Sequence, residues 1–393
     1  MKSAEILDAY NEYILSTYAR QPVIMVKGKG SVLTDVNGKK YLDFFPGWGV
    51  SNVGHCHPKV MGAVRDQIGK LIHVPNNLHH PFQAKLAKEL VRISFPGKIF
   101  FCNSGAEANE AAIKFVRAWG AGKKTEIITT LNSFHGRTMG ALTATGQLKH
   151  QKQFAPLLDG FRHVPFNDLG ALQAAVNERT SAIMLELIQG EGGICVADRE
   201  YIRAIRKICD DQKILLIIDE VQTGMGRTGE TFCFKHYGIV PDVMCLAKAL
   251  GGGLPIGCMI VKKELADVFK PGMHGSTFAG SPLVCKAALG VIKALHRYKM
   301  LANVKKLGPY LVNKLQDLKA KYLIIKEIRG LGLMIGVELT IEADKVFKEC
   351  LSRGLIINCT QGNVLRIMPA LNVTKRQIDK AIFILDKVLE GQS

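Results

Sequence analysis

The sequence lacks the features that mark several classes of protein. None of its apolar stretches approaches the roughly 20 residues that a helix needs to cross a bilayer. Its first residues form neither an apolar signal segment nor an Arg- and Ser-rich presequence. It has no internal repeat and no low-complexity linker. We therefore expect a cytoplasmic protein with no membrane partner.

The cysteines also lack the spacing of a disulfide or zinc framework. The chain has 10 cysteines, and none of them forms a C-x-x-C pair. His55, Cys56 and His57 form the only local cluster, but adjacent residues on a turn rarely point at one metal ion. We expect reduced thiols and no metal site.

The chain does carry a large excess of positive charge. It has 52 Lys and Arg against 34 Asp and Glu, which gives a net charge of +18. Such an excess can indicate nucleic acid or an anionic membrane surface as a partner. Here the basic residues are dispersed, and the longest runs are pairs such as Lys39-Lys40 and Lys123-Lys124. We therefore expect a solvated basic surface, anionic small-molecule substrates and no nucleic-acid partner.

Strand-like and helix-like segments alternate through the middle of the chain. A predicted helix over 106–119 has apolar residues at 108, 111, 112, 115, 116 and 119, which form one face. Alternation of this kind favours an α/β fold with a mainly parallel, doubly wound sheet. The short apolar runs that predict its strands lie at 99–102, 126–130, 182–187, 214–218, 243–246 and 256–261.

The C-terminal part of the chain follows a different pattern, which is typical of a small α+β domain. The elements predicted there are a long helix over 291–318, strands within 328–338, 354–358 and 364–368, and a closing helix over 375–389.

The length of 393 residues is enough for about two to three domains. We expect an N-terminal segment (1–55) that packs with the small domain or forms an arm. A large domain (56–285) and the small α+β domain (286–393) follow it.

Two of the predicted strands end near residues that could carry chemistry. The run at 214–218 leads into Asp219, at the edge where open α/β sheets bind their ligands. A carboxylate there can hold a cationic ring nitrogen or a metal, or it can simply cap a helix. The run at 243–246 is soon followed by Lys248 and by glycines at 251–253. A lysine in a partly dry site can lose its proton and form a Schiff base, so the two residues together favour catalysis.

A third element joins the strand at 99–102 to the helix at 106–119. Ser104 and Glu107 have the spacing of a capping box, and Gly105 lies in the turn between strand and helix. The free N–H groups at such a helix start can bind a phosphate, although an ordinary capped helix has the same pattern.

The loop at 224–229 matches the dinucleotide-binding pattern G-x-G-x-x-G. That pattern requires an amphipathic helix directly after it, and 230–238 is not a clear one. We therefore interpret the segment as a glycine-rich loop and not as a nicotinamide site of a dehydrogenase. No G-x-x-x-x-G-K-[ST] pattern is present, which disfavours a P-loop NTPase.

Taken together, these residues resemble those of the class III aminotransferases, which are pyridoxal phosphate (PLP) enzymes of fold type I. The resemblance extends from about Tyr18 to the C-terminus. Within the class the chain most resembles the acetylornithine aminotransferases, through 17–20, 132–138 and its compact length, whereas 43–50 is less typical. The markers of the class lie at 54–58, 103–108, 133–138, 186–193, 219–229 and 248–257.

The resemblance implies a role for each residue of the cofactor site. Lys248 would bind PLP as a Schiff base and move a proton between substrate and cofactor, and Asp219 would pair with the ring nitrogen. Phe134 and Val221 would pack on the two faces of the ring. Thr277 would contact the phosphate of a neighbouring subunit's cofactor, which implies a homodimer with shared active sites. The other expected cofactor contacts are Ser104, Gly105, Ala106 and Gln222.

The resemblance also implies two carboxylate sites for the substrates. Arg137 would bind the carboxylate remote from the reacting amine, and Arg366 would bind the α-carboxylate of 2-oxoglutarate or glutamate. While the amino donor is bound, Glu191 would pair with Arg366, because an unpaired buried arginine is costly. Glu186 and Ser276 complete the expected substrate-binding set.

The reaction that follows is a ping-pong transfer in arginine biosynthesis. The δ-amino group of N2-acetyl-L-ornithine would pass to 2-oxoglutarate and leave N-acetyl-L-glutamate 5-semialdehyde and L-glutamate. Ornithine, 4-aminobutyrate and succinyldiaminopimelate aminotransferases share the cofactor residues and stay open as alternatives. An aminomutase fits less well, because Arg137, Glu191 and Arg366 suit two alternating substrates. Outside the class, the alternative is a non-catalytic protein that binds anions or nucleic acid, and Lys248 and Asp219 argue against it.

Overall fold

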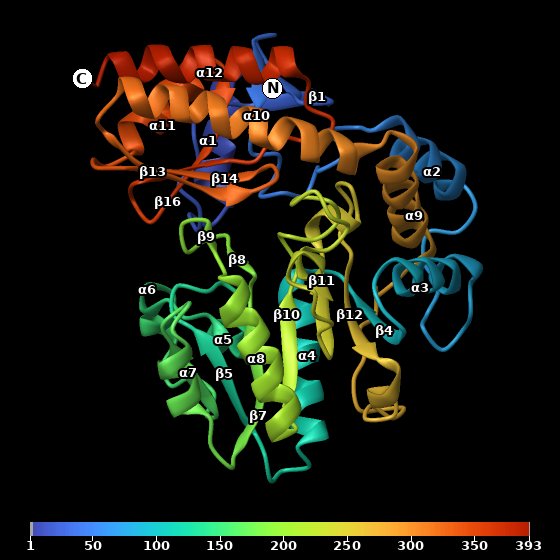
Figure 1. Cartoon of the computed structure of the whole chain (residues 1–393). Coiled ribbons are helices and arrows are strands. Elements are labelled where there is room, and N and C mark those ends of the chain that lie inside the picture. The colour runs from blue at the N-terminus through green and yellow to red at the C-terminus, as the bar shows by residue number, and fades with distance from the viewer. Residues whose placement is uncertain (1–2, 393) are drawn as a thin grey trace.

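The computed structural model describes residues 3–392 (Figure 1). Its lower part is built on one sheet of seven strands, whereas both ends of the chain lie in its upper part. The order of strands in the large sheet is β4 (Gly97–Cys102), β12 (Gly257–Lys262), β11 (Val243–Leu246), β10 (Leu215–Asp219), β7 (Thr180–Leu185), β5 (Glu126–Thr130) and β6 (Phe161–Val164). Only β12 runs antiparallel to its neighbours, which confirms the predicted α/β class with a mainly parallel sheet.

Each of the six predicted apolar runs forms a strand of this sheet. The largest difference is in β7, which ends at Leu185 instead of 187. The chain turns there because the Glu186 carboxylate accepts hydrogen bonds from the N–H groups of Phe134 (2.9 Å) and Gly190 (3.1 Å). No apolar run predicted β6, since this edge strand buries only Val164.

Helices cover both faces of the large sheet. α4 (Gly105–Trp119) begins at the predicted cap, where Ser104 Oγ accepts a hydrogen bond from Glu107 N at 3.1 Å. Alternate residues of β10 point to opposite faces, so Leu215 and Ile217 join the core under α4, while Leu216 and Ile218 join the core under α8 (Arg199–Gln212). The shorter helical segments of this part are α5 (Met139–Ala144), α6 (Leu148–Gln151), η1 (Lys152–Phe154), α7 (Leu169–Ala175), η2 (Cys233–Tyr237), η3 (Lys248–Leu250) and η4 (Lys263–Leu265).

The N-terminal and C-terminal segments share a sheet. Its order is β1 (Met25–Lys29), β2 (Val32–Asp35), β3 (Lys40–Asp43) and β15 (Leu355–Ile356), and the last two strands pair in parallel. A second, antiparallel sheet contains β13 (Ile325–Leu331), β14 (Met334–Leu339), β17 (Val364–Ile367) and β16 (Asn358–Thr360). The N-terminal segment therefore packs with the C-terminal part, while the predicted three-part domain division stays a prediction.

The predicted single helix over 291–318 is wrong, because the chain forms two helices there. α9 (Pro282–Arg297) is capped by Tyr298, and α10 (Met300–Lys321) begins after Lys299, which has a left-handed φ of +47°. Neither residue is a glycine or a proline, so the helical spacing of apolar residues continues through the break without a sequence signal. The other helices of the upper part and of its right-hand side in Figure 1 are α2 (Pro58–Ile68), α3 (Pro81–Ile93), α11 (Asp344–Ser352) and α12 (Lys375–Glu390).

The glycine-rich loop at 224–229 joins the two parts of the molecule. It is followed by the short 3₁₀ segment η2 instead of a long helix. Its Arg227 is fully buried and donates hydrogen bonds to the carbonyl oxygens of Leu333 (2.9 Å) and Pro369 (2.6 Å), and also to Asn52 Oδ1. The loop therefore fixes the C-terminal part of the chain to the end of β10.

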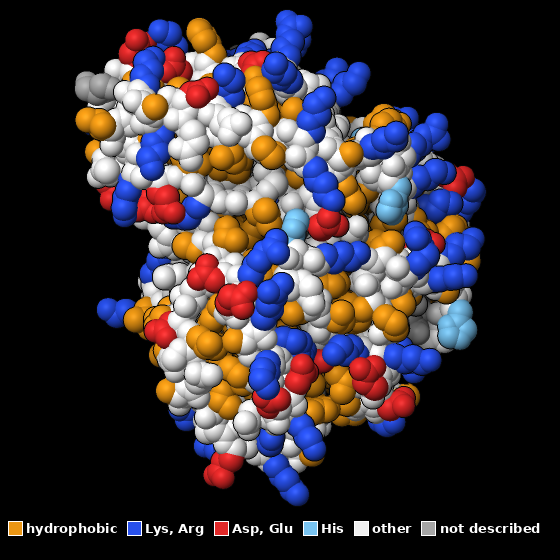
Figure 2. Space-filling model, viewed as in Figure 1, with side chains coloured by type: hydrophobic (Ala, Val, Ile, Leu, Met, Phe, Trp, Pro, Cys, Tyr) orange, Lys and Arg blue, Asp and Glu red, His pale blue; other side chains and the backbone are white. Residues whose placement is uncertain are grey.

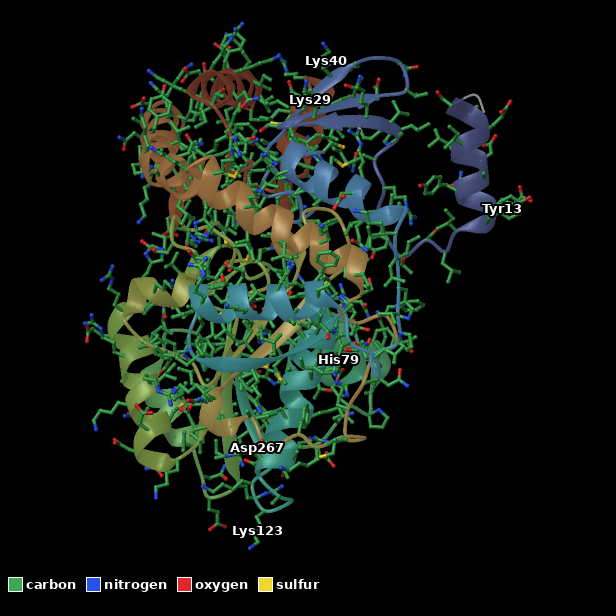
Figure 3. The ribbon with its side chains drawn as sticks, turned by 90° about the vertical axis from the view of Figure 1, so that its right-hand side faces the viewer. Tyr13, Lys29, Lys40, His79, Lys123 and Asp267 are labelled. Atoms are coloured by element: carbon green, nitrogen blue, oxygen red, sulfur yellow. The ribbon has the colours of Figure 1, made fainter. Side chains whose placement is uncertain are left out.

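Two features concern the outside of the molecule. α1 (Ser3–Tyr13) has no buried residue and stands apart from the rest of the chain in Figure 3, where its last residue, Tyr13, is labelled. Lys and Arg side chains are spread over the whole face shown in Figure 2 instead of gathering in one patch. Across residues 3–392, no helix is both long and apolar enough to span a membrane.

Candidate active site

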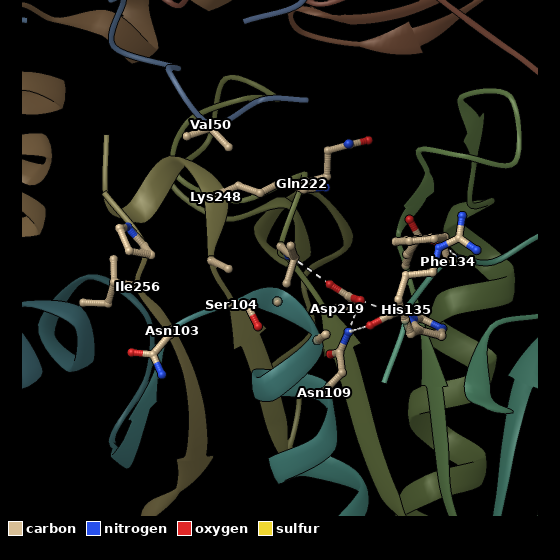
Figure 4. A pocket seen from close by; sticks show the side chains of 18 of the residues that line it. Val50, Asn103, Ser104, Asn109, Phe134, His135, Asp219, Gln222, Lys248 and Ile256 are labelled. Atoms are coloured by element: carbon tan, nitrogen blue, oxygen red, sulfur yellow. Dashed lines mark hydrogen bonds and ion pairs between the residues drawn. The ribbon is translucent and has the colours of Figure 1, made fainter. Parts of the chain in front are cut away.

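A cavity of about 460 Å³ lies at the carboxyl ends of β10 and β11, next to the start of α4 (Figure 4). It brings together most of the residues predicted to form the site. Those that line it are Ser104, Gly105, Ala106, Phe134, Arg137, Glu186, Glu191, Asp219, Val221, Gln222 and Lys248.

Asp219 is the most strongly held acid in the cavity. It ends β10 and is buried, with Oδ1 accepting a hydrogen bond from Val221 N at 2.9 Å. Its Oδ2 accepts a hydrogen bond from Asn109 Nδ2 at 2.7 Å and lies 2.9 Å from His135 Nδ1. Figure 4 shows these two side chains meeting at the carboxylate. The arrangement fixes the carboxylate in one orientation, facing the cavity.

The sequence reasoning assigned no role to Asn109 or His135. Asn109 also donates to the carbonyl oxygen of His135 at 2.6 Å, so the two residues support each other as well as Asp219. One signal was present: Asn109 lies on the buried face of α4, where an amide needs a polar partner. His135 lies within the marker at 133–138, but only the fold shows that it reaches Asp219.

Lys248 lies opposite this acid, just after β11. Its backbone has a positive φ of +41°, an unusual conformation for a residue with a side chain. Burial lowers the pKa of its ammonium group, although the carboxylates of Glu191, Asp219 and Glu186 oppose the shift. The neutral amine is therefore more accessible than in water, and this is the form that can act as a nucleophile.

The start of α4 forms a concave backbone surface beside these groups. The first N–H groups of a helix have no partner within the helix and attract anions. A Cβ atom on Gly105 would come within 2.7 Å of Val221 Cγ1, and one on Gly136 within 2.8 Å of Ala106 Cβ. Both glycines therefore allow neighbouring segments to pack directly against this helix start, which lines the cavity.

Glu186 lies at the back of the cavity and is almost fully buried. Burial raises the pKa of its carboxyl to about 7, and the nearby His135 partly opposes this shift. Its two oxygens accept the N–H groups of Phe134 and Gly190, so it orders the segments that carry Phe134 and Glu191. This role was not predicted, because it depends on backbone atoms that are distant in the sequence.

Arg366 lies directly behind Glu191 and is 1% exposed. Its Nη1 donates to Glu191 Oε1 at 2.7 Å and to the carbonyl oxygen of Gly190 at 2.9 Å, and its Nε donates to Asn358 Oδ1 at 2.7 Å. The guanidinium carbon lies 4.7 Å from the centre of the Phe45 ring. Burial opposes the charged form of Glu191, but Arg366 and nearby lysines lower the pKa of its carboxyl below the ordinary value. The predicted contact between Glu191 and Arg366 is therefore present as an ion pair.

The remaining predicted residues take different positions. Arg137 is exposed at the cavity and lies over the Phe134 ring, 5.5 Å from its centre. Ser276 and Thr277 are not among the residues that line the cavity in the described part of the chain. Ser276 Oγ accepts a hydrogen bond from Asn103 Nδ2 at 3.0 Å, and Thr277 is exposed.

Comparison with known proteins agrees with this geometry. The model of the family "Aminotransferase class-III" matches residues 14–389. The chain belongs to the class III aminotransferases. An acetylornithine aminotransferase from Methanocaldococcus jannaschii is 50% identical over 392 residues, with 99% of this chain and 98% of the relative covered. One from Caldanaerobacter subterraneus is 51% identical over 383 residues, with 96% and 97% covered.

Solved structures of ornithine and acetylornithine aminotransferases have the same fold. An ornithine aminotransferase from Toxoplasma gondii superposes with a TM-score of 0.95 at 31% identity, and the match covers 99% of this chain and 94% of that one. That structure is described as having partial occupancy of PLP at its active site.

The residues that line the cavity of this class III aminotransferase are chemically suited to hold PLP. It offers a lysine whose amine is readily deprotonated, a fixed carboxylate and a helix start with free N–H groups. Among residues 3–392, Gln222 Oε1 is one of the buried oxygens without a hydrogen-bond partner, and Gln222 lines the cavity. A buried amide of this kind calls for a polar ligand, since leaving it unsatisfied is costly. Lys248, Asp219, Gln222 and the start of α4 would therefore hold the cofactor.

Proposed function

We propose that this chain is a PLP-dependent aminotransferase that acts on N2-acetyl-L-ornithine and 2-oxoglutarate. The products are N-acetyl-L-glutamate 5-semialdehyde and L-glutamate, as in arginine biosynthesis. The observation that carries the choice of donor is the identity of about half of all residues with acetylornithine aminotransferases over nearly the whole chain.

The residues of the cavity suit both halves of such a transfer. When bound, PLP supplies an aldehyde that carries the amino group between the two substrates and a ring that accepts electrons. Lys248 would hold the cofactor, and its Nζ would move the proton at the substrate carbon that bears the reacting amine. Asp219, fixed by Asn109 and His135, would hold a proton at the ring nitrogen. Phe134 and Val221 would exclude water from the two faces of the ring.

Two arginines would recognise the alternating substrates. Arg137, exposed at the cavity, would bind the α-carboxylate of N-acetylornithine or the remote carboxylate of 2-oxoglutarate. Arg366 would bind the α-carboxylate of 2-oxoglutarate after Glu191 moves away. While the donor is bound, the ion pair with Glu191 would keep the charge of Arg366 satisfied. The same enzyme could thus accept substrates with and without a carboxylate next to the reacting carbon.

We also propose that the enzyme acts in the cytoplasm as a homodimer. Ser276 and Thr277 lie outside the cavity of their own chain, and Thr277 is exposed. This placement leaves Thr277 available to serve the cavity of a second copy, where it would contact the cofactor phosphate, with Ser276 beside it. Sedimentation of the purified protein tests the dimer.

Ornithine is the second candidate donor, because ornithine aminotransferases are among the structures that superpose with TM-scores of 0.95 or more. A donor panel decides between them: N-acetylornithine, ornithine, 4-aminobutyrate and N-succinyldiaminopimelate, each with PLP and 2-oxoglutarate, compared by kcat/KM for glutamate formation. We expect N-acetylornithine to lead. If another donor leads, the donor assignment is wrong and the entrance at 43–50 is the place to look for the cause.

A further inference from the structure

The turn that carries Glu191 is built from flexible residues. It connects β8 (Ile188–Gln189) to β9 (Cys195–Val196), and this hairpin rises from the lower part of the molecule towards β13 and β16 (Figure 1). Glycines flank Glu191 at 190, 192 and 193, and Gly193 has a φ of +100°. Glycine loses more conformational freedom on ordering than any other residue. Left alone, such a turn would hold Glu191 in many positions.

Side chains from the opposite sheet remove that freedom: Arg329 Nε donates to the carbonyl oxygen of Gly193 at 2.9 Å, and two others act on Glu191 itself. Thr360 Oγ1, at the end of β16, donates a hydrogen bond to the carbonyl oxygen of Glu191 at 2.8 Å. Gln361 Nε2 donates to the same oxygen at 2.6 Å. The main chain of Glu191 is therefore held by two donors, and neither of them touches its carboxylate.

Arg366 is held just as firmly by groups other than Glu191. Asn358 Oδ1 and the carbonyl oxygen of Gly190 accept its N–H groups, and Phe45 lies against its guanidinium. Its side chain is 1% exposed, whereas that of Glu191 is 27% exposed. Of the two partners in the ion pair, only the Glu191 carboxylate borders on solvent and has room to move.

We infer that Thr360 and Gln361 are positioning residues that set how readily Arg366 is released to bind a substrate carboxylate. They hold the main chain of Glu191 both while its carboxylate pairs with Arg366 and after it has swung away. The inference rests on the proposed function, since it assigns the Glu191–Arg366 pair to the choice between the two amino substrates.

The direction of the effect follows from where backbone entropy is lost. With the hydrogen bonds from Thr360 and Gln361 present, the Glu191 main chain is ordered in either position of the carboxylate. Forming the ion pair then costs little further backbone entropy. Without them, only the neighbouring carbonyl oxygens of Gly190 and Gly193 stay held, by Arg366 and Arg329, so Glu191 itself is free when its carboxylate is away and must be ordered to form the pair. The paired state then loses roughly the free energy of fixing one residue, which shifts the balance towards free Arg366 on the order of 5- to 30-fold. The kcat/KM for glutamate, which needs free Arg366, should therefore rise, whereas the kcat/KM for N-acetylornithine should not.

The test compares two amino donors on one form of the holoenzyme. N-acetylornithine and L-glutamate both react with the PLP form, and the cofactor absorbance reports each single turnover. In the double variant Thr360→Val with Gln361→Met, the ratio of kcat/KM for glutamate to that for N-acetylornithine should rise by about 5- to 30-fold, and each single variant should show part of that rise. Thr360→Ser keeps the hydroxyl group and should leave the ratio near that of the original protein.

A matched control lies on the same sheet. Asn363 Nδ2 donates to the carbonyl oxygen of Leu339 at 3.0 Å and does not touch the Glu191 turn. A merely structural loss, as in Asn363→Leu, should lower kcat/KM for glutamate and for N-acetylornithine alike and leave the ratio of the two unchanged. Gln361 is exposed, so its variant can be measured even if Thr360→Val proves unstable.

The outcomes separate this inference from the proposed function. An unchanged ratio in both Thr360→Val and Gln361→Met would overturn the inference alone, as would an equal rise in Asn363→Leu. If the original protein transfers the amino group of neither donor, the proposed function fails and this inference fails with it.

Discussion

Replacing Arg366 by methionine should affect the two amino substrates very unequally. Methionine keeps apolar bulk against Phe45 but removes every N–H group of the guanidinium. Arg366 is 1% exposed, so a substrate carboxylate on it would be shielded from water and held by charge-assisted hydrogen bonds. Two such bonds contribute about 3–6 kcal/mol, so the glutamate half-reaction should slow by roughly 10²- to 10⁴-fold.

N-acetylornithine should lose much less in the same variant. It presents no carboxylate to Arg366, and the Glu191 side chain, 27% exposed, can turn to water once its partner is gone. We expect a loss below about tenfold in that half-reaction, followed by cofactor absorbance in single turnovers. Arg137→Met is the control. Both amino substrates would place their remote carboxylate on Arg137, so both half-reactions should slow in this variant. Equal losses for the two donors in Arg366→Met would refute the assignment of Arg366.

Further predictions concern the other buried groups. Lys248→Ala should abolish turnover while some PLP stays bound without a covalent link, and normal activity in this variant would contradict its assignment. Asn109→Leu removes one charge-assisted and one neutral hydrogen bond and should lower the free energy of unfolding by about 2–4 kcal/mol, measured in urea without cofactor; an unchanged value would count against its support of Asp219. Burial raises the pKa of Glu220 from 4.5 to about 7, so the folded state holds this proton where the unfolded state has lost it, and stability falls as pH rises from about 4.5 to about 7. Glu220→Gln should remove about 3 kcal/mol of that fall, and identical pH profiles of unfolding in both proteins would contradict the raised pKa.

Much of the site could be predicted because it depends on local sequence. The apolar runs of β10 and β11 are short and bounded, so the positions of Asp219 and Lys248 at the edge of the sheet follow from strand geometry. The start of α4 has its own cap, Ser104, and needs no distant contact to form. These features are set within a few residues, which is the range over which a sequence pattern carries information.

The parts that could not be predicted depend on contacts between distant residues. Asn109 meets Asp219 only when α4 and β10 pack together, across a sequence separation of 110 residues, and His135 reaches the same acid from the loop after β5. Thr360 and Gln361 reach a main-chain oxygen about 170 residues away, which leaves no pattern of side-chain types to read. The break between α9 and α10 was also missed, because the left-handed residue there is Lys299, which is neither a glycine nor a proline.

The most direct test of the proposed reaction follows the transferred nitrogen. Purified protein with PLP, 2-oxoglutarate and N-acetylornithine labelled with ¹⁵N at the δ-amino group is incubated, and glutamate is analysed by mass spectrometry, with Lys248→Ala as the control. The account predicts ¹⁵N-labelled glutamate and an equal amount of N-acetylglutamate semialdehyde, with neither product in the control. Unlabelled glutamate, or no glutamate at all, would contradict it.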